Sequence, residues 1–215
     1  MPNLDDLIVL ALAAGREIMA VRAAGFDTER KLDGSPVTIA DQRAEALLDE
    51  GLRRTAPGVP MRAEAAAAAG RVPILGERFF CVDPLDGTRG FAKGGDEFTV
   101  NIALVVGGAP VQGVIYAPAT GELYAGEPGR AVRALGDAAL TAIATATAPP
   151  NAIWRVIASD YSGRNEKTAH FIAALDTAAI HASSSIKFCR IAEGAADLYP
   201  RFGDVCQWDI AAGHA

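Results

Sequence analysis

The chain has 215 residues and a formal net charge of −6, and 50% of its residues are hydrophobic while 21% are charged. That composition is typical of a soluble globular protein, and the acidic balance argues against binding to a nucleic acid polymer, which normally needs a basic surface. No apolar run is long enough to span a bilayer, and the first six residues lack the basic start of a signal peptide. Three cysteines without a C-x-x-C pair favour a reducing compartment, so we expect a cytoplasmic protein without an integral membrane segment.

Two helices are predicted in the first 55 residues. Apolar residues recur at helical spacing over residues 4–24, and Gly25 then ends the pattern. Thr38 is a predicted N-cap for a second helix that runs to about Thr55, with Asp41 at its third position in capping-box spacing. By this pattern alone, Asp41 is an ordinary carboxylate in the first turn of a helix.

Glu64 is predicted to lie at the junction between a short strand and a helix. A strand is predicted over residues 59–61, and the five alanines of residues 65–69 favour a helix. A carboxylate at such a position is either a partner of the helix dipole or a metal ligand, and both interpretations remain open.

An acidic corner follows the apolar run of residues 78–82, which is predicted to be a buried strand. Asp83 and Asp86 stand three residues apart around a proline, and Gly87 makes a strong turn signal with Asp86. Magnesium prefers oxygen ligands from a few carboxylates and leaves other positions for water and phosphate. A lone pair of this kind is also compatible with an ordinary acidic turn.

The rest of the chain predicts a layered mixed α/β fold (α+β in its first part). Strand-like runs over 97–106, 111–116 and 122–125 indicate an antiparallel meander, and residues 127–151 are interpreted as a connection between two subdomains. We expect an α+β subdomain over residues 1–135, carrying the meander and metal site, and an α/β subdomain over 150–215. In the latter, strands are predicted over 152–158, 180–182 and 197–202, and helices over 166–175, over 186–195 and from Trp208 onward.

Five carboxylates share one kind of placement: each is expected at the start of a helix or the end of a strand, beside turn residues. Helix starts offer free N–H groups to anions, so carboxylates beside them would form a site for a metal-bridged phosphate. Two or more Mg²⁺ ions in such a site lower the pKa of a bound water, and Thr88 is placed to orient that water. The five are Asp41, Glu64, Asp83, Asp86 and Asp209.

Two motifs carry a resemblance to a known family. The runs DPLDGT at residues 83–88 and WDIAAG at 208–213 together resemble the hallmarks of the inositol monophosphatase superfamily of Mg²⁺-dependent, lithium-sensitive phosphatases. Further runs, at 34–38, 95–104, 184–189 and 198–203, are similar to its bacterial 3′(2′),5′-bisphosphate nucleotidase branch. The resemblance implies an αβαβα sandwich of the inositol monophosphatase type, and it covers nearly the whole chain.

The resemblance also implies roles for individual residues. Two or three Mg²⁺ ions are expected, and Asp41 and Thr88 would position or activate the attacking water. The backbone amides of Gly87 and Thr88 would bind the scissile phosphate. The metal ligands would be Glu64, Asp83, Asp86, Asp209 and the carbonyl of Leu85, and the residues that face the nucleotide and its second phosphate would be Ser185, Lys187 and Arg201.

The activity implied is removal of the 3′-phosphate of adenosine 3′,5′-bisphosphate, a small substrate of sulfur metabolism, by a hydrolase that yields AMP and phosphate. The resemblance further implies a homodimer, and a peripheral position at the inner membrane as the alternative to the cytoplasm. Two departures from the pattern leave other functions open. Ala65 stands where the family usually has a second Glu, and relatives continue beyond the position of Ala215, so the second subdomain is expected to be shortened. The alternatives are an inositol or sugar monophosphatase and a catalytically impaired homologue that binds phosphate.

Overall fold

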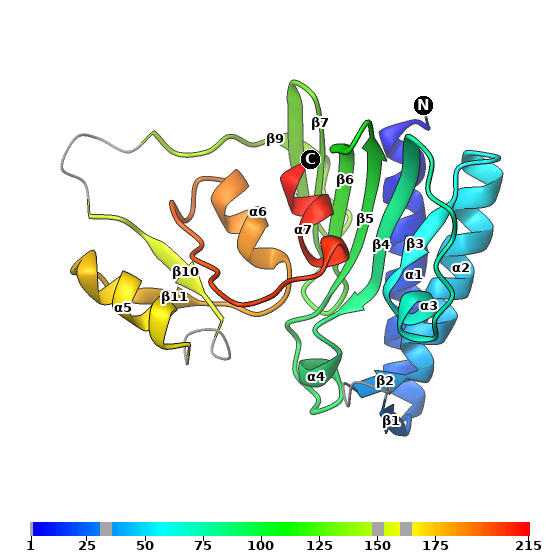
Figure 1. The fold of residues 1–215 in the computed structure, drawn as a ribbon, viewed down its shortest axis with the longest axis horizontal. Helices are drawn as coiled ribbons and strands as arrows, with labels where there is room; N and C mark the ends of the chain where they lie inside the picture. Colours follow the sequence, from blue (N-terminus) through cyan, green and yellow to red (C-terminus); the bar gives the residue numbers. More distant parts are fainter. Residues whose placement is uncertain (1, 31–35, 148–152, 160–164) are drawn as a thin grey trace.

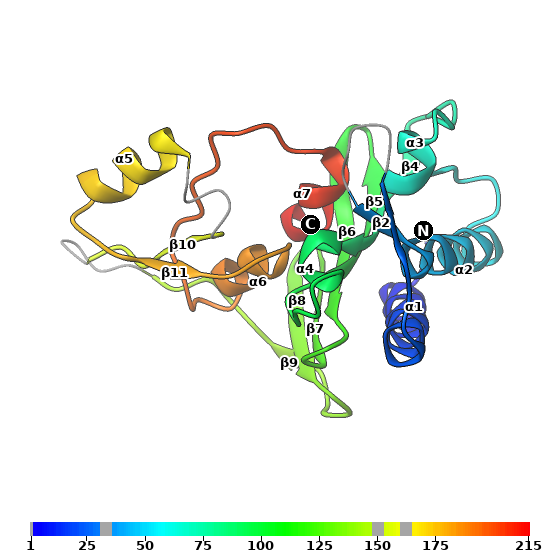
Figure 2. The same ribbon diagram turned by 90° about the horizontal axis from the view of Figure 1, so that it is seen from below.

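Five layers of secondary structure make up the fold of the computed structural model, which describes residues 2–30, 36–147, 153–159 and 165–215. Helices α1 and α2 come first, then a seven-stranded sheet, helices α6 and α7, a two-stranded sheet, and helix α5 (Figure 1). The same order is seen in the perpendicular view (Figure 2). The predicted αβαβα sandwich is therefore confirmed. No helix in the described ranges has the length and apolar character that crossing a membrane requires.

The outer helical layer forms as its capping residues predict. Helix α1 (Leu4–Ala24) begins after Asn3, and α2 (Ile39–Thr55) begins after Thr38, whose side chain forms the predicted capping box with Asp41. The two helices bury their apolar stripes against one face of the large sheet, where Leu7, Ile18, Leu48 and Leu52 are almost inaccessible to solvent. This packing fixes the N-terminus of α2, and with it Asp41, at one end of the sheet.

The large sheet has the strand order β3-β4-β5-β6-β7-β8-β9. Strands β3 and β4 are parallel, whereas all later neighbours are antiparallel, as the predicted meander requires. Side chains alternate across the sheet, so Ile102 and Leu104 of β5 face α1 and α2, while Asn101 and Ala103 face the opposite way. The strands are β3 (Met61–Ala63), β4 (Arg78–Asp86), β5 (Thr99–Val106), β6 (Ala109–Ala117), β7 (Glu122–Glu127), β8 (Arg130–Leu135) and β9 (Thr141–Ala142).

The interpretation of residues 127–151 as a connection is wrong for residues 130–135 and 141–142, which form strands of the large sheet. Strand β8 pairs with β7 along its whole length, and β9 adds a short seventh strand. Val132 is the one buried residue of β8 and has arginines nearby on both sides, so the strand lacks the apolar alternation on which the prediction depended. Residues 148–151 lie outside the described residues, as do Gly34 and Ser35 of one family-like run.

The second half supplies the remaining layers. The small sheet pairs β10 (Val156–Ala158) with β11 (Ala179–His181) in parallel, and α5 (Glu166–Ala174) lies on its outer side (Figure 1). The strand predicted over 197–202 is wrong, because there only Leu198 forms a single bridge, to Val156. The subdomain boundary stays a prediction. The remaining elements are β1 (Thr28–Arg30), β2 (Pro36–Thr38), α3 (Glu64–Ala68), α4 (Thr88–Phe91), α6 (Ile186–Ala192) and α7 (Gln207–His214).

An ion-pair network holds α6 against the large sheet. Arg190 of α6 contacts Glu122 of β7 at 2.6 Å and Glu193 at 2.9 Å, and it donates a hydrogen bond of 2.7 Å to the hydroxyl of Tyr124. Near this network, Cys189 of α6 and Cys81 of β4 are both buried in the same apolar cluster. The network therefore holds the last turn of α6, which carries Arg190, against β7.

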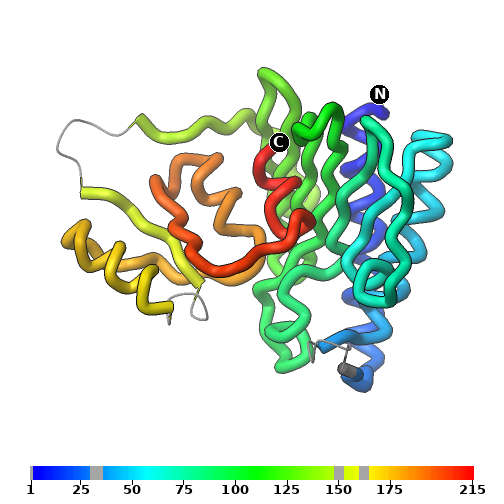
Figure 3. The backbone as a smooth tube through the Cα atoms, in the orientation of Figure 1, coloured from blue at the N-terminus to red at the C-terminus, as the bar shows by residue number. Residues whose placement is uncertain are grey.

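Helix α7 crosses the sheet so closely that it needs a glycine beneath it. A Cβ at Gly113 of β6 would lie 2.2 Å from the carbonyl oxygen of Ala212 and 2.9 Å from Cβ of Ala215. The first obstacle belongs to α7 and the second to the residue that follows it, and Figure 3 shows this red segment lying over the sheet. The approach therefore depends on the missing side chain.

We expect Gly113→Ala to lower the free energy of unfolding by about 1–3 kcal/mol, because an added methyl in a packed contact must push α7 away. Thermal unfolding measures the loss, and hydrogen exchange of the amides of α7 shows whether that helix loosens first. Gly76→Ala is the matched control, since nothing lies within 4 Å of a Cβ there. Equal stability of the two variants would contradict the close approach.

Candidate metal and phosphate site

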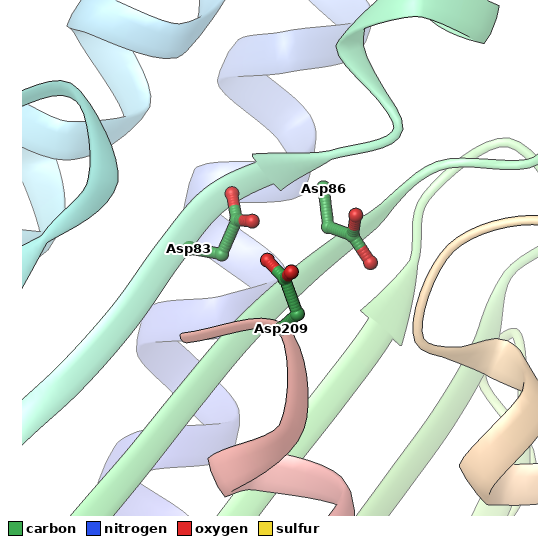
Figure 4. A group of neighbouring side chains, drawn as sticks. All are labelled: Asp83, Asp86 and Asp209. Atoms are coloured by element: carbon green, nitrogen blue, oxygen red, sulfur yellow. The ribbon is translucent and has the colours of Figure 1, made fainter. Parts of the chain in front are cut away.

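Three carboxylates meet where β4 ends and α7 begins. One oxygen each from Asp83, Asp86 and Asp209 lies within 4.8 Å of the other two. Asp83 and Asp86 come from the end of β4, and Asp209 comes from the first turn of α7, so the side chains converge from two sides (Figure 4). The structure thus brings together residues that are more than 120 positions apart in the sequence.

The local sequence determines the conformation of the corner that carries Asp83 and Asp86. Strand β4 pairs regularly with β5 as far as Asp83, and the register then shifts before Asp86, across Pro84 and Leu85. The buried Leu85 anchors this bulge, and its N–H donates to the carboxylate of Asp83 at 3.1 Å. Gly87 follows with φ +95°, and a Cβ there would lie 2.9 Å from the carbonyl oxygen of Glu97. Only glycine satisfies both conditions, so the turn is fixed by its sequence.

The carboxylates repel one another. Burial raises the pKa of Asp83 well above its ordinary value, and the charges of Glu64 and Asp86 raise it further. Glu64 also shares a side-chain hydrogen bond with Asp83, so this fourth carboxylate lies beside the cluster, and its role as a metal ligand stays a prediction. Burial, followed by the charge of Asp86, raises the pKa of Asp209 to about 6. An oxygen-only group of donors with excess negative charge suits a hard divalent cation such as Mg²⁺.

Asp41 and Thr88 form a pair beside the cluster. The Thr88 hydroxyl lies 3.0 Å from Asp41 Oδ1 and 2.9 Å from the carbonyl oxygen of Leu85, and both are acceptors. The other oxygen of Asp41 accepts from the N–H of Thr38 at 2.7 Å and from its hydroxyl at 2.8 Å. Asp41 is only 2% exposed, so its contact with the site passes through Thr88.

The cluster lines a cleft of about 850 Å³ whose walls come from both halves of the chain. Gly87 and Thr88 line this cleft together with the cations Lys187 and Arg201. Lys187 is nearly buried, its ammonium lies 5.3 Å from the centre of the Tyr199 ring, and burial lowers its pKa. A cleft that is lined by both carboxylates and cations is suited to a ligand that carries more than one anionic group.

Ser185 occupies a different environment from the other residues expected to face the substrate. Its hydroxyl oxygen lies 2.8 Å from Asp86 Oδ2, 2.9 Å from the carbonyl oxygen of Asp209 and 2.8 Å from the amide nitrogen of Asn101. It is 3% exposed and lies beneath the carboxylates. Its contact with a substrate stays a prediction, whereas its contact with the cluster is a feature of the structure.

Sequence reasoning missed several residues of the site. Asn101 and Thr99 are polar residues within an otherwise apolar strand, and that interruption was the signal that could have drawn attention to them. Tyr199 and Arg89 also line the cleft. Nothing in their local pattern marks them, because their position depends on how the two halves pack.

An acidic cluster and two cations that line one cleft, carried by an αβαβα sandwich, define the class of phosphate-ester hydrolases. The sequence profile of the inositol monophosphatase family matches residues 3–215, and the chain belongs to this family. The family predicted from the motifs is thereby confirmed.

The relatives within this family include both bisphosphate nucleotidases and an inositol monophosphatase, at different levels of sequence identity. The 3′(2′),5′-bisphosphate nucleotidase CysQ of Salmonella typhimurium is 40% identical over 214 residues, which cover 99% of this chain and 85% of that protein. Inositol monophosphatase 2 of Solanum lycopersicum is 26% identical over 223 residues, which cover 98% and 83% respectively. The crystal structure of CysQ from Bacteroides thetaiotaomicron matches with a TM-score of 0.78 at 34% identity, over 99% of this chain and 84% of that one.

Proposed function

We propose that the chain is a Mg²⁺-dependent 3′(2′),5′-bisphosphate nucleotidase that converts adenosine 3′,5′-bisphosphate to AMP and phosphate. The observation that carries the proposal is that one cleft is lined both by the carboxylate cluster and by Lys187 and Arg201. Two separate anionic groups of one substrate would then be bound, one at the metal ions that the carboxylates hold and one at the two cations. The 40% identity to a bisphosphate nucleotidase, against 26% to an inositol monophosphatase, supports the same choice.

The residues of the cluster fit the metal that the family implies. Asp83, Asp86 and Asp209 would hold Mg²⁺, with Glu64 and the carbonyl of Leu85 completing the donor set, and the number of ions stays a prediction. The raised pKa values of Asp83 and Asp209 mark carboxylates that a cation would stabilise in their charged form. When bound, Mg²⁺ neutralises phosphate charge and lowers the pKa of the attacking water.

Thr88 and Asp41 would move the proton. A hydroxyl has one proton and two lone pairs, so Thr88 can donate to Asp41 and accept from a water in the cleft at the same time. As water attacks phosphorus, the bond to the 3′-oxygen breaks, and the proton of the water passes through Thr88 to Asp41. The departing oxygen takes up a proton from solvent. The amides of Gly87 and Thr88, in the first turn of α4, would bind the phosphate that is transferred.

Lys187 and Arg201 would bind the second phosphate. Arg201 is exposed and donates to the carbonyl oxygen of Asp204 at 3.0 Å, so its planar group is held near the mouth of the cleft. Guanidinium groups bind phosphate in a two-pronged manner, and ammonium groups bind it as point charges. A dianion beside Lys187 would also restore the charged form that burial disfavours.

The test compares turnover of adenosine 3′,5′-bisphosphate and inositol 1-phosphate at saturating Mg²⁺. We expect the bisphosphate to be preferred, and Arg201→Ala to raise its KM about tenfold to a hundredfold, because a charge-assisted hydrogen bond is lost. Arg78→Ala, which removes an exposed cation at the far end of β4, is the matched control and should change nothing.

Two other outcomes select the alternatives. Equal or better turnover of inositol 1-phosphate would identify an inositol monophosphatase. If neither substrate were hydrolysed, Ala65→Glu would decide between an impaired enzyme, which regains Mg²⁺-dependent turnover, and a homologue that only binds phosphate.

A further inference from the structure

We propose that Asn101 and Ser185 are positioning residues that hold the Asp86 carboxylate and the start of α7 in the arrangement that binds the metal. The inference rests on the proposed function, and it deepens it, because it assigns metal affinity to two side chains outside the carboxylate set. Neither residue is charged. Ser185 contacts the carboxylate of Asp86 and the backbone of Asp209, and Asn101 acts on both through Ser185.

The position of Asn101 in the sheet already points to the cluster. Asn101 is fully buried in β5, and the strand register places it directly opposite Asp83 of β4. Thr99, the other polar residue on this face of β5, is placed opposite Asp86 in the same way. A buried amide in the middle of an apolar strand is costly unless its hydrogen bonds are made. Each of the two polar residues of β5 is therefore the cross-strand neighbour of one of the two acidic residues of β4.

Four hydrogen bonds then form a closed ring. Asn101 Nδ2 donates to Ser185 Oγ at 2.8 Å, and Asn101 Oδ1 accepts from the Thr99 hydroxyl at 2.9 Å. Thr99 Oγ1 lies 2.5 Å from Ser184 Oγ, which in turn accepts from the N–H of Ser185 at 2.6 Å. The ring begins and ends at Ser185, so the orientation of each side chain in it is set by its hydrogen-bond partners.

The direction of the ring decides where the Ser185 proton goes. Because Ser185 Oγ already accepts from the Asn101 amide, its own proton points to Asp86 Oδ2 at 2.8 Å or to the Asp209 carbonyl oxygen at 2.9 Å. Both of these atoms only accept. One hydroxyl thus lies within hydrogen-bond distance of both the carboxylate of the corner and the backbone of the helix that carries Asp209. When its proton points to Asp86, it holds Oδ2 of that carboxylate in place.

The backbone of Ser184 adopts a strained conformation in this arrangement. Ser184 has φ +56°, in the left-handed region that residues other than glycine rarely adopt. Its carbonyl oxygen accepts from the Lys187 ammonium, and its hydroxyl is held by the ring. A strained residue directly before a buried serine is the pattern expected where side chains must be aimed at a site.

The experiment measures Mg²⁺ binding directly, by calorimetry without substrate, in Ser185→Ala and Asn101→Leu. We expect each variant to weaken Mg²⁺ binding about tenfold to a hundredfold, the usual effect of removing a group that orients a metal ligand. The Mg²⁺ concentration for half-maximal turnover should rise by the same factor, while KM for the substrate at saturating Mg²⁺ should stay within about twofold.

Gln112→Leu is the matched control, since Gln112 is another buried amide of the same sheet, and it contacts Pro2 and Glu127 instead of the cluster. Unchanged Mg²⁺ affinity in Ser185→Ala would overturn the proposal, as would an equal loss in Gln112→Leu. If Asn101→Leu did not fold, the loss of one hydroxyl in Ser185→Ala would decide alone. A wild-type chain that binds Mg²⁺ but hydrolyses neither substrate would refute the proposed function and leave this test standing.

Discussion

Asp86→Asn is expected to lower kcat by about 10³-fold or more while the protein keeps its fold. A catalytic metal ion supplies several kcal/mol of transition-state stabilisation, and each 1.36 kcal/mol is about a factor of ten in rate. Asp86 is only partly buried and touches Ser185 through one oxygen, which an amide oxygen of the same size can replace. The substitution therefore removes charge from the metal site without removing volume from the core.

The same variant should be more stable than the wild type when no metal is bound. Burial raises the pKa of both Asp83 and Asp209, and the charge of Asp86 raises both further, so the folded protein without metal is destabilised by repulsion whenever these groups are ionised. Neutralising Asp86 relieves that repulsion at neutral pH. We expect the Tm in a chelating buffer to rise and the increase in Tm on adding Mg²⁺ to shrink or vanish.

Kinetics and thermal unfolding with and without Mg²⁺ check both parts. Glu50→Gln is the control, since it neutralises an exposed carboxylate of α2 that pairs with Arg54 at 2.8 Å. It should leave kcat and the Mg²⁺-induced change in Tm as they are, because exposed pairs contribute little. Near-normal turnover in Asp86→Asn would refute the site, and loss of the fold would show that the carboxylate is structural.

The acidic corner could be predicted from the sequence because its causes are local. Pro84 and Gly87 fix the turn through their own backbone preferences, and the capping box of Thr38 and Asp41 is a matter of three-residue spacing. The arrival of Asp209 could not be predicted in this way. It depends on α7 lying against Gly113, a residue that nothing in its own neighbourhood marks as a contact point.

The contacts of Ser185 and Asn101 could not be predicted from the sequence either. The family resemblance placed Ser185 near the substrate, whereas the structure shows its hydroxyl against Asp86. The sequence places Asn101 in a strand and in a family-like run but assigns it no role, because alternation predicts which face of the sheet a residue occupies and not which residues it contacts there. The contacts of Asn101 depend on the strand register, which places it opposite Asp83, and on the packing of α6, whose N-cap Ser185 it contacts.

Asp41→Asn is expected to lower kcat by about 10²–10⁴-fold, the range for loss of a general base, with Mg²⁺ affinity nearly unchanged. Oδ2 of Asp41 accepts two hydrogen bonds from Thr38, so an asparagine would place its carbonyl oxygen there and turn its NH₂ toward Thr88. The Thr88 hydroxyl would then accept a hydrogen bond from this amide instead of donating one to a carboxylate. Its own proton would point to the carbonyl oxygen of Leu85, 2.9 Å away. The relay is reversed, although the capping box largely survives.

A second substitution tests whether the two residues act as one unit. Thr88→Val keeps the shape of the side chain and removes its hydroxyl, so it should lower kcat about as much as Asp41→Asn. The double variant should be no slower than either single variant, because a relay that is already broken cannot be broken again. Thr88→Ser, which keeps the hydroxyl, should retain most of the rate. Additive losses in the double variant would show that Asp41 and Thr88 act separately, and a normal rate in Thr88→Val would remove the hydroxyl from the mechanism.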